Sequence, residues 1–546
     1  MTMGQLSDAA AMFNDLELDR KSRIPAYVQI AAHVRNKMIG GVLKIGDRLP
    51  PNRELARRLE VHRTTVTTAY AELEADGLIS SQVGRGTFVS ALPAPSATTI
   101  MAGAFVRGIS RRSEAAPSTG ASLVAAASSS TPVKPSPMNW SAILLPVQRD
   151  RWLSGLLHSS SERDVISFAH GLPESSLFPT DDFRRSVDRV LRREGQALLQ
   201  LGATSGYAPL LEFLCSNMAR DGINVRPDEV LITNGCQQSL DLIRRILVGE
   251  GDEIAIEEPT YPGAISVFCS TGSRYATIPV SAAGMDLTVL EDVLMQRRPK
   301  LIYTVPTFHN PTGVTMSLSA RRRLLELAVR YRVPIIEDDI YRELHYEGPM
   351  LPSLKALDQH DVVISINSFS KVGFPGLRVG WIAAPRIVVQ HLNIAKQNSD
   401  LHASLLTQAA IFEFSRHGLL AKHIRKVRKE YATRRDLMIG AMEKHFPAGV
   451  RWNKPLGGMA IWVNLPEQLT AGEVLMHSAE RGVVFSPGEH FFTAVQRHNS
   501  LRLCFTMASP AKIEEGVKRL GAIIKDRLSV NRKTKARRTA SLRALV

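Results

Sequence analysis

The chain has 546 residues, more than three times the length of a typical domain of about 150 residues, so at least two folded units are expected. Hydrophobic residues make up 44% and charged residues 22%, a balance that indicates globular domains and excludes a collagen-like or wholly disordered chain. Lys and Arg exceed Asp and Glu by 68 to 52, which favours polyanionic partners such as DNA.

The sequence carries no signal for a membrane, a disulfide framework or a metal. It has no run of about 18 apolar residues, and its first 14 residues lack a basic start followed by an apolar stretch. The cysteines, Cys215, Cys236, Cys269 and Cys504, are far apart and lack the spacing of zinc ligands. We therefore expect a cytoplasmic protein without a metal site.

Composition divides the chain into five predicted segments. A short N-terminal extension (1–22) precedes a charged, helix-patterned segment at 23–90. Residues 91–163 are rich in Ala, Ser and Pro and hold few large apolar groups, so they predict a flexible linker. Globular texture returns at 164–528, and a basic tail follows at 529–546.

The segment at 23–90 has the pattern of a helix-turn-helix. Apolar spacing predicts helices over 30–39, from residue 52 onward and over 63–74. The third helix begins with Arg63, Thr64 and Thr65, basic and small polar side chains that suit a DNA major groove. Strands at 77–79 and 84–89 predict a two-stranded wing, with Arg85 between two glycines at its tip.

Residues 27–89 resemble the winged helix-turn-helix of GntR-type bacterial regulators. The matching positions are Pro51, Arg53, Leu55, Ala56, Leu59, Val61, Arg63, Thr64, Thr65, Val66, Tyr70, Leu73, Gly77, Leu78, Ile79, Gly84, Gly86 and Thr87. The resemblance implies that Arg53, Arg63, Thr64 and Thr65 contact phosphates or bases of double-stranded operator DNA, and that Arg85 enters the adjacent groove. A small helical dimerisation module with solvated arginines is the alternative.

The segment at 164–528 alternates short β-branched runs with helical patterns. Apolar runs at 230–233, 301–305 and 333–336 are separated by amphipathic stretches. This alternation predicts an α/β domain with a largely parallel sheet.

Lys371 is the most informative residue of this segment. It closes Ser368-Phe369-Ser370-Lys371 after a predicted strand at 362–366, and Arg378 follows seven residues later. A lysine in this setting can form an imine with an aldehyde, while the hydroxyls and the arginine bind a phosphate ester. The pattern points to pyridoxal 5'-phosphate (PLP).

Other strand ends carry groups that suit the same cofactor. Asp338 could pair with a protonated pyridine nitrogen, and Tyr341 and Asn310 could donate to the phenolic oxygen of the ring. Gly235 and Cys236 open a helix whose free N–H groups suit a phosphate. Tyr261 offers an aromatic face on which the ring could stack.

In this order and spacing the motifs resemble the fold-type I aminotransferases over about residues 167–528. The resemblance implies a mostly parallel central sheet with a smaller α+β domain. It makes Lys371 the Schiff-base lysine, Asp338 the pyridine partner, Asn310 and Tyr341 the phenolate partners and Tyr261 the stacking ring. It also makes Gly235, Cys236, Ser368 and Arg378 the phosphate ligands, and Arg502 the group that binds a substrate or effector carboxylate.

The whole chain resembles the MocR/PdxR group of the GntR family, in which a reader domain is joined to an aminotransferase-like domain. The resemblance implies a homodimeric, PLP-dependent transcriptional regulator that senses PLP itself, an amino-compound effector, or both. A catalytically active aminotransferase with a fused DNA-binding domain is the main alternative, and an architectural DNA-binding protein is a third.

Overall fold

The computed structural model describes residue 16 and residues 26–39, 42–75, 78–82, 86–90, 165–270, 272–493 and 498–543. Contacts divide the chain into two compact units, Met1–Val147 and Gln148–Val546, each with its own hydrophobic core.

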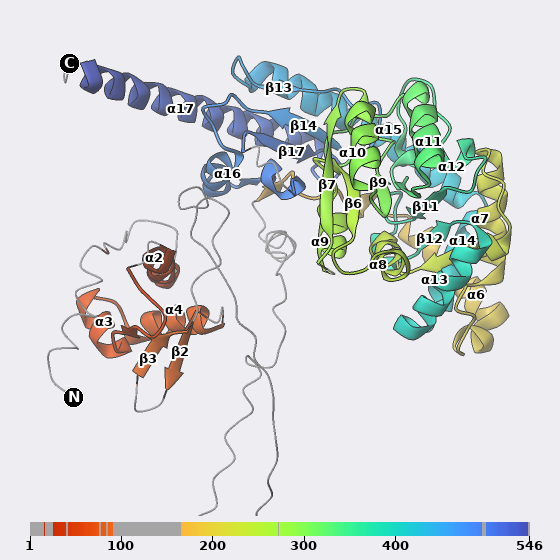
Figure 1. Cartoon of the computed structure of the whole chain (residues 1–546), viewed down its shortest axis with the longest axis horizontal. Helices are drawn as coiled ribbons and strands as arrows, with labels where there is room; N and C mark the ends of the chain where they lie inside the picture. The colour runs from red at the N-terminus through yellow and green to blue at the C-terminus, as the bar shows by residue number, and fades with distance from the viewer. Residues whose placement is uncertain are drawn as a thin grey trace, which may run out of the picture. The chain divides into compact units, whose positions relative to one another are not determined.

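The described residues of the first unit form three helices and a small antiparallel sheet (Figure 1). The helices are α2 (Ala26–Ile39), α3 (Asn52–Arg58) and α4 (Arg63–Ala75). The strands β1 (Arg48–Leu49), β2 (Ile79–Gln82) and β3 (Gly86–Val89) pair in the order β1-β3-β2. Ile30, Val34, Val66 and Leu73 are fully buried between α2 and α4, because their spacing puts them on one face of each helix. The predicted winged helix-turn-helix is confirmed.

The second unit is built on an eight-stranded sheet in the order β5-β12-β11-β10-β9-β6-β7-β8. The strands are β5 (Val230–Thr233), β6 (Glu253–Glu258), β7 (Arg274–Ser281), β8 (Gly284–Met285), β9 (Leu301–Thr304), β10 (Ile335–Asp338), β11 (Val363–Ser368) and β12 (Gly380–Ala383). Neighbours from β11 to β7 run parallel, whereas β12 is antiparallel to both β11 and β5, and β8 is antiparallel to β7. The prediction of a mostly parallel sheet is confirmed.

Helices cover both faces of this sheet. The helices of this part of the chain, some of which pack on other helices, are α6 (Thr180–Leu198), α7 (Ala208–Arg220), α8 (Cys236–Leu247), α9 (Pro262–Cys269), α10 (Leu287–Arg297), α11 (Leu318–Tyr331), α12 (Leu354–Leu357), α13 (Arg386–Asp400), α14 (Leu405–Arg416) and α15 (Leu419–His445). Side chains alternate along each strand, so Ile254 and Ile256 of β6 belong to one core while Ala255 belongs to the other. The result is a three-layer arrangement of helices, sheet and helices, in which both faces of the central strands are buried.

A smaller α+β region follows in sequence. Its antiparallel sheet has the order β13-β14-β17-β16, formed by β13 (Arg451–Trp452), β14 (Ala460–Asn464), β16 (Ser486–Pro487) and β17 (Ser500–Cys504). Separately, β4 (Ile166–Ser167) pairs with β15 (Val483–Val484). The helices are α16 (Ala471–Glu480) and α17 (Pro510–Arg543), and α17 continues through much of the predicted basic tail. None of the described helices is both long enough and apolar enough to span a bilayer.

Candidate functional site

The candidate cofactor site lies at one edge of the eight-stranded sheet. Strands β5, β6, β9, β10 and β11 point the same way, so their carboxyl ends meet at that edge. Each ends at, or is followed by, a residue singled out by sequence: Cys236, Tyr261, Asn310, Asp338 and Lys371 respectively. Ligands of open α/β sheets bind at carboxyl edges of this kind.

Lys371 lies in the turn after β11. Its Nζ donates to the carbonyl of Gly171 at 2.8 Å and lies 5.9 Å from the centre of the Tyr341 ring. Burial lowers the pKa of Lys371 to about 8, and the positive charge of Arg502 acts in the same direction. The amine is therefore neutral in a larger fraction of molecules than a surface lysine would be.

Asp338 ends β10 and is 1% exposed. Its Oδ2 accepts a hydrogen bond from the Tyr303 hydroxyl at 2.8 Å, while its buried Oδ1 has no hydrogen-bond partner among the described residues. Burial raises the pKa of Asp338 to about 6, although the Tyr303 hydrogen bond opposes that shift. A buried carboxylate oxygen that lacks a donor fits the N–H of a protonated pyridine.

A tight turn joins β5 to α8. Gly235 has φ +89°, a left-handed conformation that favours glycine, and a Cβ built there would lie 2.6 Å from Nη2 of Arg378. The Arg378 guanidinium donates to the carbonyl of Asn234 at 3.0 Å. Nearby, Ser368 Oγ donates at 3.1 Å to the carbonyl of Val379, the residue that follows Arg378.

The aromatic and amide groups lie on loops beside these strands. Tyr261 caps the N-terminus of α9, and its hydroxyl donates to Gln237 Oε1 at 3.2 Å. Tyr341, in the turn after β10, is 6% exposed. Burial raises the pKa of both tyrosines, so both hydroxyls remain protonated donors at neutral pH.

Arg502 lies on β17 and is 5% exposed. Its Nη1 donates to Asn310 Oδ1 at 2.7 Å, and its Nη2 donates to the carbonyl of Ala169 at 2.8 Å. With Gly171, Tyr341 and other residues it lines a small pocket. Both terminal nitrogens of this guanidinium are therefore engaged by protein groups.

Several contacts of this site were not found by sequence reasoning. Tyr303 lies inside an apolar strand, where it is not distinguishable from an ordinary core residue, yet it orients Asp338. Gly171 supplies a carbonyl to Lys371, and backbone acceptors leave no trace in side-chain patterns.

The predicted DNA-contacting residues gather at the start of α4. Arg63 and Thr64 are exposed, and Thr65 is half-buried. Arg53, on α3, is also exposed, whereas Arg85 lies outside the described residues. Sequence reasoning gave His62 no role. Its Nδ1 forms a hydrogen bond with Thr64 Oγ1 at 2.8 Å, and this contact stabilises the start of α4.

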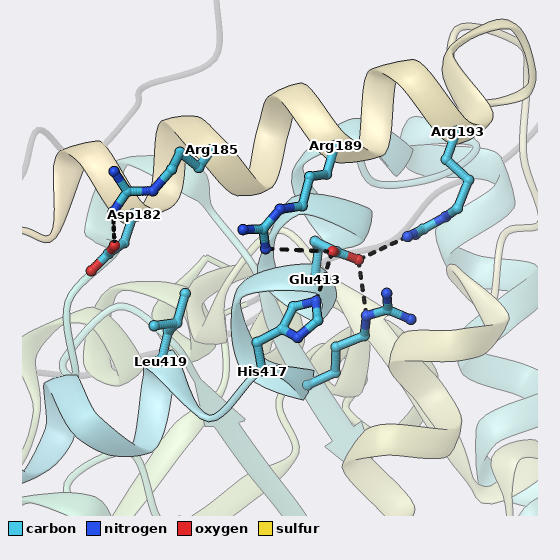
Figure 2. A pocket seen from close by; sticks show the side chains of 8 residues that line it. Asp182, Arg185, Arg189, Arg193, Glu413, His417 and Leu419 are labelled. Carbon is cyan, nitrogen blue, oxygen red and sulfur yellow. Dashed lines mark hydrogen bonds and ion pairs between the residues drawn. The ribbon is translucent and has the colours of Figure 1, made fainter.

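An arginine cluster between α6 and α14 lies outside the cofactor site (Figure 2). Its centre is Glu413, whose side chain is 1% exposed and which pairs with Arg193 at 2.9 Å, Arg416 at 3.0 Å, His417 at 2.9 Å and Arg189 at 3.9 Å. Burial opposes ionisation of Glu413, but hydrogen bonds from Arg193 and His417 outweigh it and lower the pKa of the carboxyl. The cluster fastens α6 to α14.

Comparison with known proteins separates the two units. Residues 26–89 match the family described as bacterial regulatory proteins, gntR family, and residues 163–520 match aminotransferase class I and II. Over 93% of this chain and 98% of its own length, the Bacillus subtilis uncharacterized HTH-type transcriptional regulator YdfD is 30% identical. The probable rhizopine catabolism regulatory protein MocR of Rhizobium meliloti is also 30% identical, over 92% of this chain and 95% of its own.

The second unit also resembles solved enzymes. The crystal structure of LysN, an alpha-aminoadipate aminotransferase from Thermus thermophilus, has a TM-score of 0.68 and 38% identity, covering 72% of this chain and all of that chain. The matches to MocR-type regulators nonetheless extend over nearly the whole chain, reader and large unit together. The chain belongs to the MocR-type regulators, in which a GntR helix-turn-helix domain is fused to an aminotransferase class I and II domain.

Proposed function

We propose that this regulator binds PLP at Lys371, and that its aminotransferase-like domain senses PLP, an amino-compound effector, or both. The observation that carries the proposal is the buried Oδ1 of Asp338, which has no donor among the described residues and lies at the same sheet edge as Lys371. An amine, an unsatisfied carboxylate and a glycine turn facing an arginine match the aldehyde, ring nitrogen and phosphate of one cofactor.

Each residue has one task in this proposal. Lys371 holds the cofactor covalently, and Asp338 keeps a proton on the ring nitrogen. Asn310 and Tyr341 donate to the phenolic oxygen, and Tyr261 stacks on the ring. The phosphate is bound by Gly235, Cys236, Ser368 and Arg378. When bound, PLP supplies a conjugated ring that withdraws electrons from an attached amino group.

The LysN crystal structure supports this assignment. That enzyme was solved in complex with N-(5'-phosphopyridoxyl)-L-leucine, a phosphopyridoxyl group joined to an amino acid. An amino-acid effector in the present chain would bring a carboxylate as well as an amine. Arg502 binds that carboxylate in our proposal.

Effector binding would alter the contacts of Arg502. This guanidinium holds Asn310 and the carbonyl of Ala169, so a carboxylate that takes one of these positions releases part of the loop after β4 or after β9. A ligand shifts a conformational equilibrium only through its different affinity for the two states. The exchange at Arg502 provides such a difference.

The N-terminal unit supplies the DNA contacts. Arg53, Arg63, Thr64 and Thr65 contact the operator, and Arg85 contacts it from the wing. The proposed domain boundaries are 23–90 for the reader and 164–528 for the sensor. The linker between them, at 91–163, lies outside the described residues.

A homodimer completes the proposal. Leu199 and Leu201 are each 76% exposed, and Ile387, Ile394 and Leu401 are 53–60% exposed at intervals of seven residues along α13 and its end. Apolar side chains spaced in this way indicate a contact surface, and two readers fit a two-fold operator. Sedimentation at micromolar concentration with PLP present should give a dimer, and a monomer would contradict this part.

The PLP assignment is tested by absorbance. The purified protein should show a visible band that borohydride abolishes, and Lys371→Ala should lack it. Lys371→Arg is the matched control, because it keeps a positive charge but cannot form the linkage. A borohydride-sensitive band that survives in both variants would mean that the assigned lysine is wrong.

Aminotransferase activity is the second candidate function. The large unit is 38% identical to LysN, an aminotransferase, whereas the whole chain is 30% identical to YdfD, a transcriptional regulator. We therefore propose a direct assay of aminotransferase activity. Amino donors and a keto acid are supplied in excess over the protein. Many turnovers per site would favour an enzyme, whereas a single half-reaction would favour a sensor.

A further inference from the structure

A buried ion pair on α13 lies behind the proposed phosphate turn. The side chain of Lys396 is fully buried, and its Nζ donates to both carboxylate oxygens of Asp400, at 2.6 and 2.8 Å. Neither residue carries a role in the proposed cofactor site. A fully buried lysine is costly unless it is paired and hydrogen-bonded, so this arrangement calls for a reason.

Asp400 also reaches the turn between β5 and α8. Its Oδ2 accepts hydrogen bonds from Asn234 Nδ2 at 2.5 Å and from Gln238 Nε2 at 2.7 Å. Burial alone would raise the pKa of Asp400, but hydrogen bonds from Lys396, Gln238 and Asn234 outweigh it and hold the pKa below its ordinary value. The carboxylate is therefore ionised at neutral pH and joins α13 to this turn.

Asn234 is held on three sides. Its backbone N–H donates to Gln238 Oε1 at 2.7 Å, its carbonyl accepts from Arg378 Nη2 at 3.0 Å, and its side chain donates to Asp400. The next residue is Gly235 at φ +89°, which opens the first turn of α8. The orientation of Asn234 thus sets the direction of the first N–H groups of α8 and the place of the Arg378 guanidinium.

We propose that Asp400 is a positioning residue for the phosphate of the cofactor, acting through Asn234 and Gln238 without touching the phosphate itself. The inference rests on the proposed PLP function. Because the hydrogen bonds reach only Asn234 in the turn and Gln238 in the first turn of α8, Asp400 should influence recognition of the phosphate and not of the pyridine ring. If the ion pair were purely structural, its loss would weaken recognition of the phosphate and of the pyridine ring equally.

The test compares two ligands that differ only in the phosphate. Apoprotein of the full chain is titrated with PLP and with pyridoxal, and the ratio of the two dissociation constants is taken. Lys396→Met with Asp400→Ala removes both buried charges together, so no unpaired lysine remains. We expect this double variant to bind PLP about tenfold more weakly, which corresponds to about 1.4 kcal/mol, with pyridoxal affinity unchanged.

Lys396→Met alone is the matched control. It leaves Asp400 to accept from Asn234 and Gln238, so the ratio should stay near the wild-type value. Asn234→Leu cuts the same connection from the other side and leaves the ion pair intact, which guards against a double variant that does not fold. The ³¹P resonance of bound PLP should move in the double variant and in Asn234→Leu, but not in Lys396→Met.

The outcomes are separable. An unchanged ratio of dissociation constants in Asn234→Leu, or an equal loss of PLP and pyridoxal affinity in the folded double variant, would overturn the positioning role. Failure of the wild-type protein to form a borohydride-sensitive linkage would instead overturn the proposed function.

Discussion

The pH dependence of cofactor capture follows from the environment of Lys371. A lysine attacks an aldehyde as the neutral amine, and burial lowers the pKa of Lys371 from an ordinary value of 10.5 to about 8. At pH 7 roughly 10% of the amine is neutral, against roughly 0.03% at the ordinary value, a gain of about 300-fold.

Stopped-flow absorbance of apoprotein mixed with PLP measures this effect. The second-order rate constant should rise through pH 7 and level off above about pH 8, where the amine is already neutral. Arg502→Ala should move the midpoint upward, because the positive guanidinium disfavours the ammonium form of Lys371. N-α-acetyl-lysine is the control, since it shares the titrations of PLP itself but has an ordinary amine.

A midpoint near the ordinary lysine value would refute the reasoning. So would a rate constant that parallels the N-α-acetyl-lysine control over the whole pH range. Either result would mean that water reaches Lys371 as freely as it reaches a surface lysine.

Three further predictions concern separate parts of the chain. Asp338→Ala should weaken PLP binding and change its absorbance spectrum, because the ring nitrogen loses its carboxylate; an unaltered spectrum and affinity would argue against that role. Arg63→Ala should weaken specific operator binding by about 1–3 kcal/mol in a gel-shift titration and leave the cofactor spectrum unchanged. Operator affinity and preference for the operator's base sequence that survive the substitution would contradict this prediction. Glu413→Gln should destabilise the protein by about 1–2 kcal/mol at neutral pH, because the arginines lose their buried carboxylate partner. The loss stays this small because these half-exposed arginines regain contact with water. Because the folded pKa of Glu413 is lowered, its stabilisation is present above the unfolded pKa and lost as pH falls through the folded pKa, so the two proteins should converge in acid melts.

The sequence by itself determined the two families and several of the elements. Helical spacing at Ile30, Val34 and Met38 predicted α2, and the run at 230–233 is β5. These signals are local, because a helix or a buried strand is specified by the periodicity of its own residues. The order of strand ends carrying Gly235, Asp338 and Lys371 then sufficed to predict one site, since parallel strands end at one edge.

Only the tertiary structure decided which groups engage one another within that site. Arg502 donates to Asn310 from 192 positions away, and Asn234 donates to Asp400 from 166 positions away. The Tyr303 hydroxyl donates to Asp338 from a strand whose other residues are mostly apolar, so the sequence pattern did not single it out. Hydrogen bonds of this kind depend on a few tenths of an ångström between distant segments, and no periodicity in either segment encodes them. The sequence therefore determined which groups reach the sheet edge, and the packing of α13, β9 and β17 decided how those groups are held.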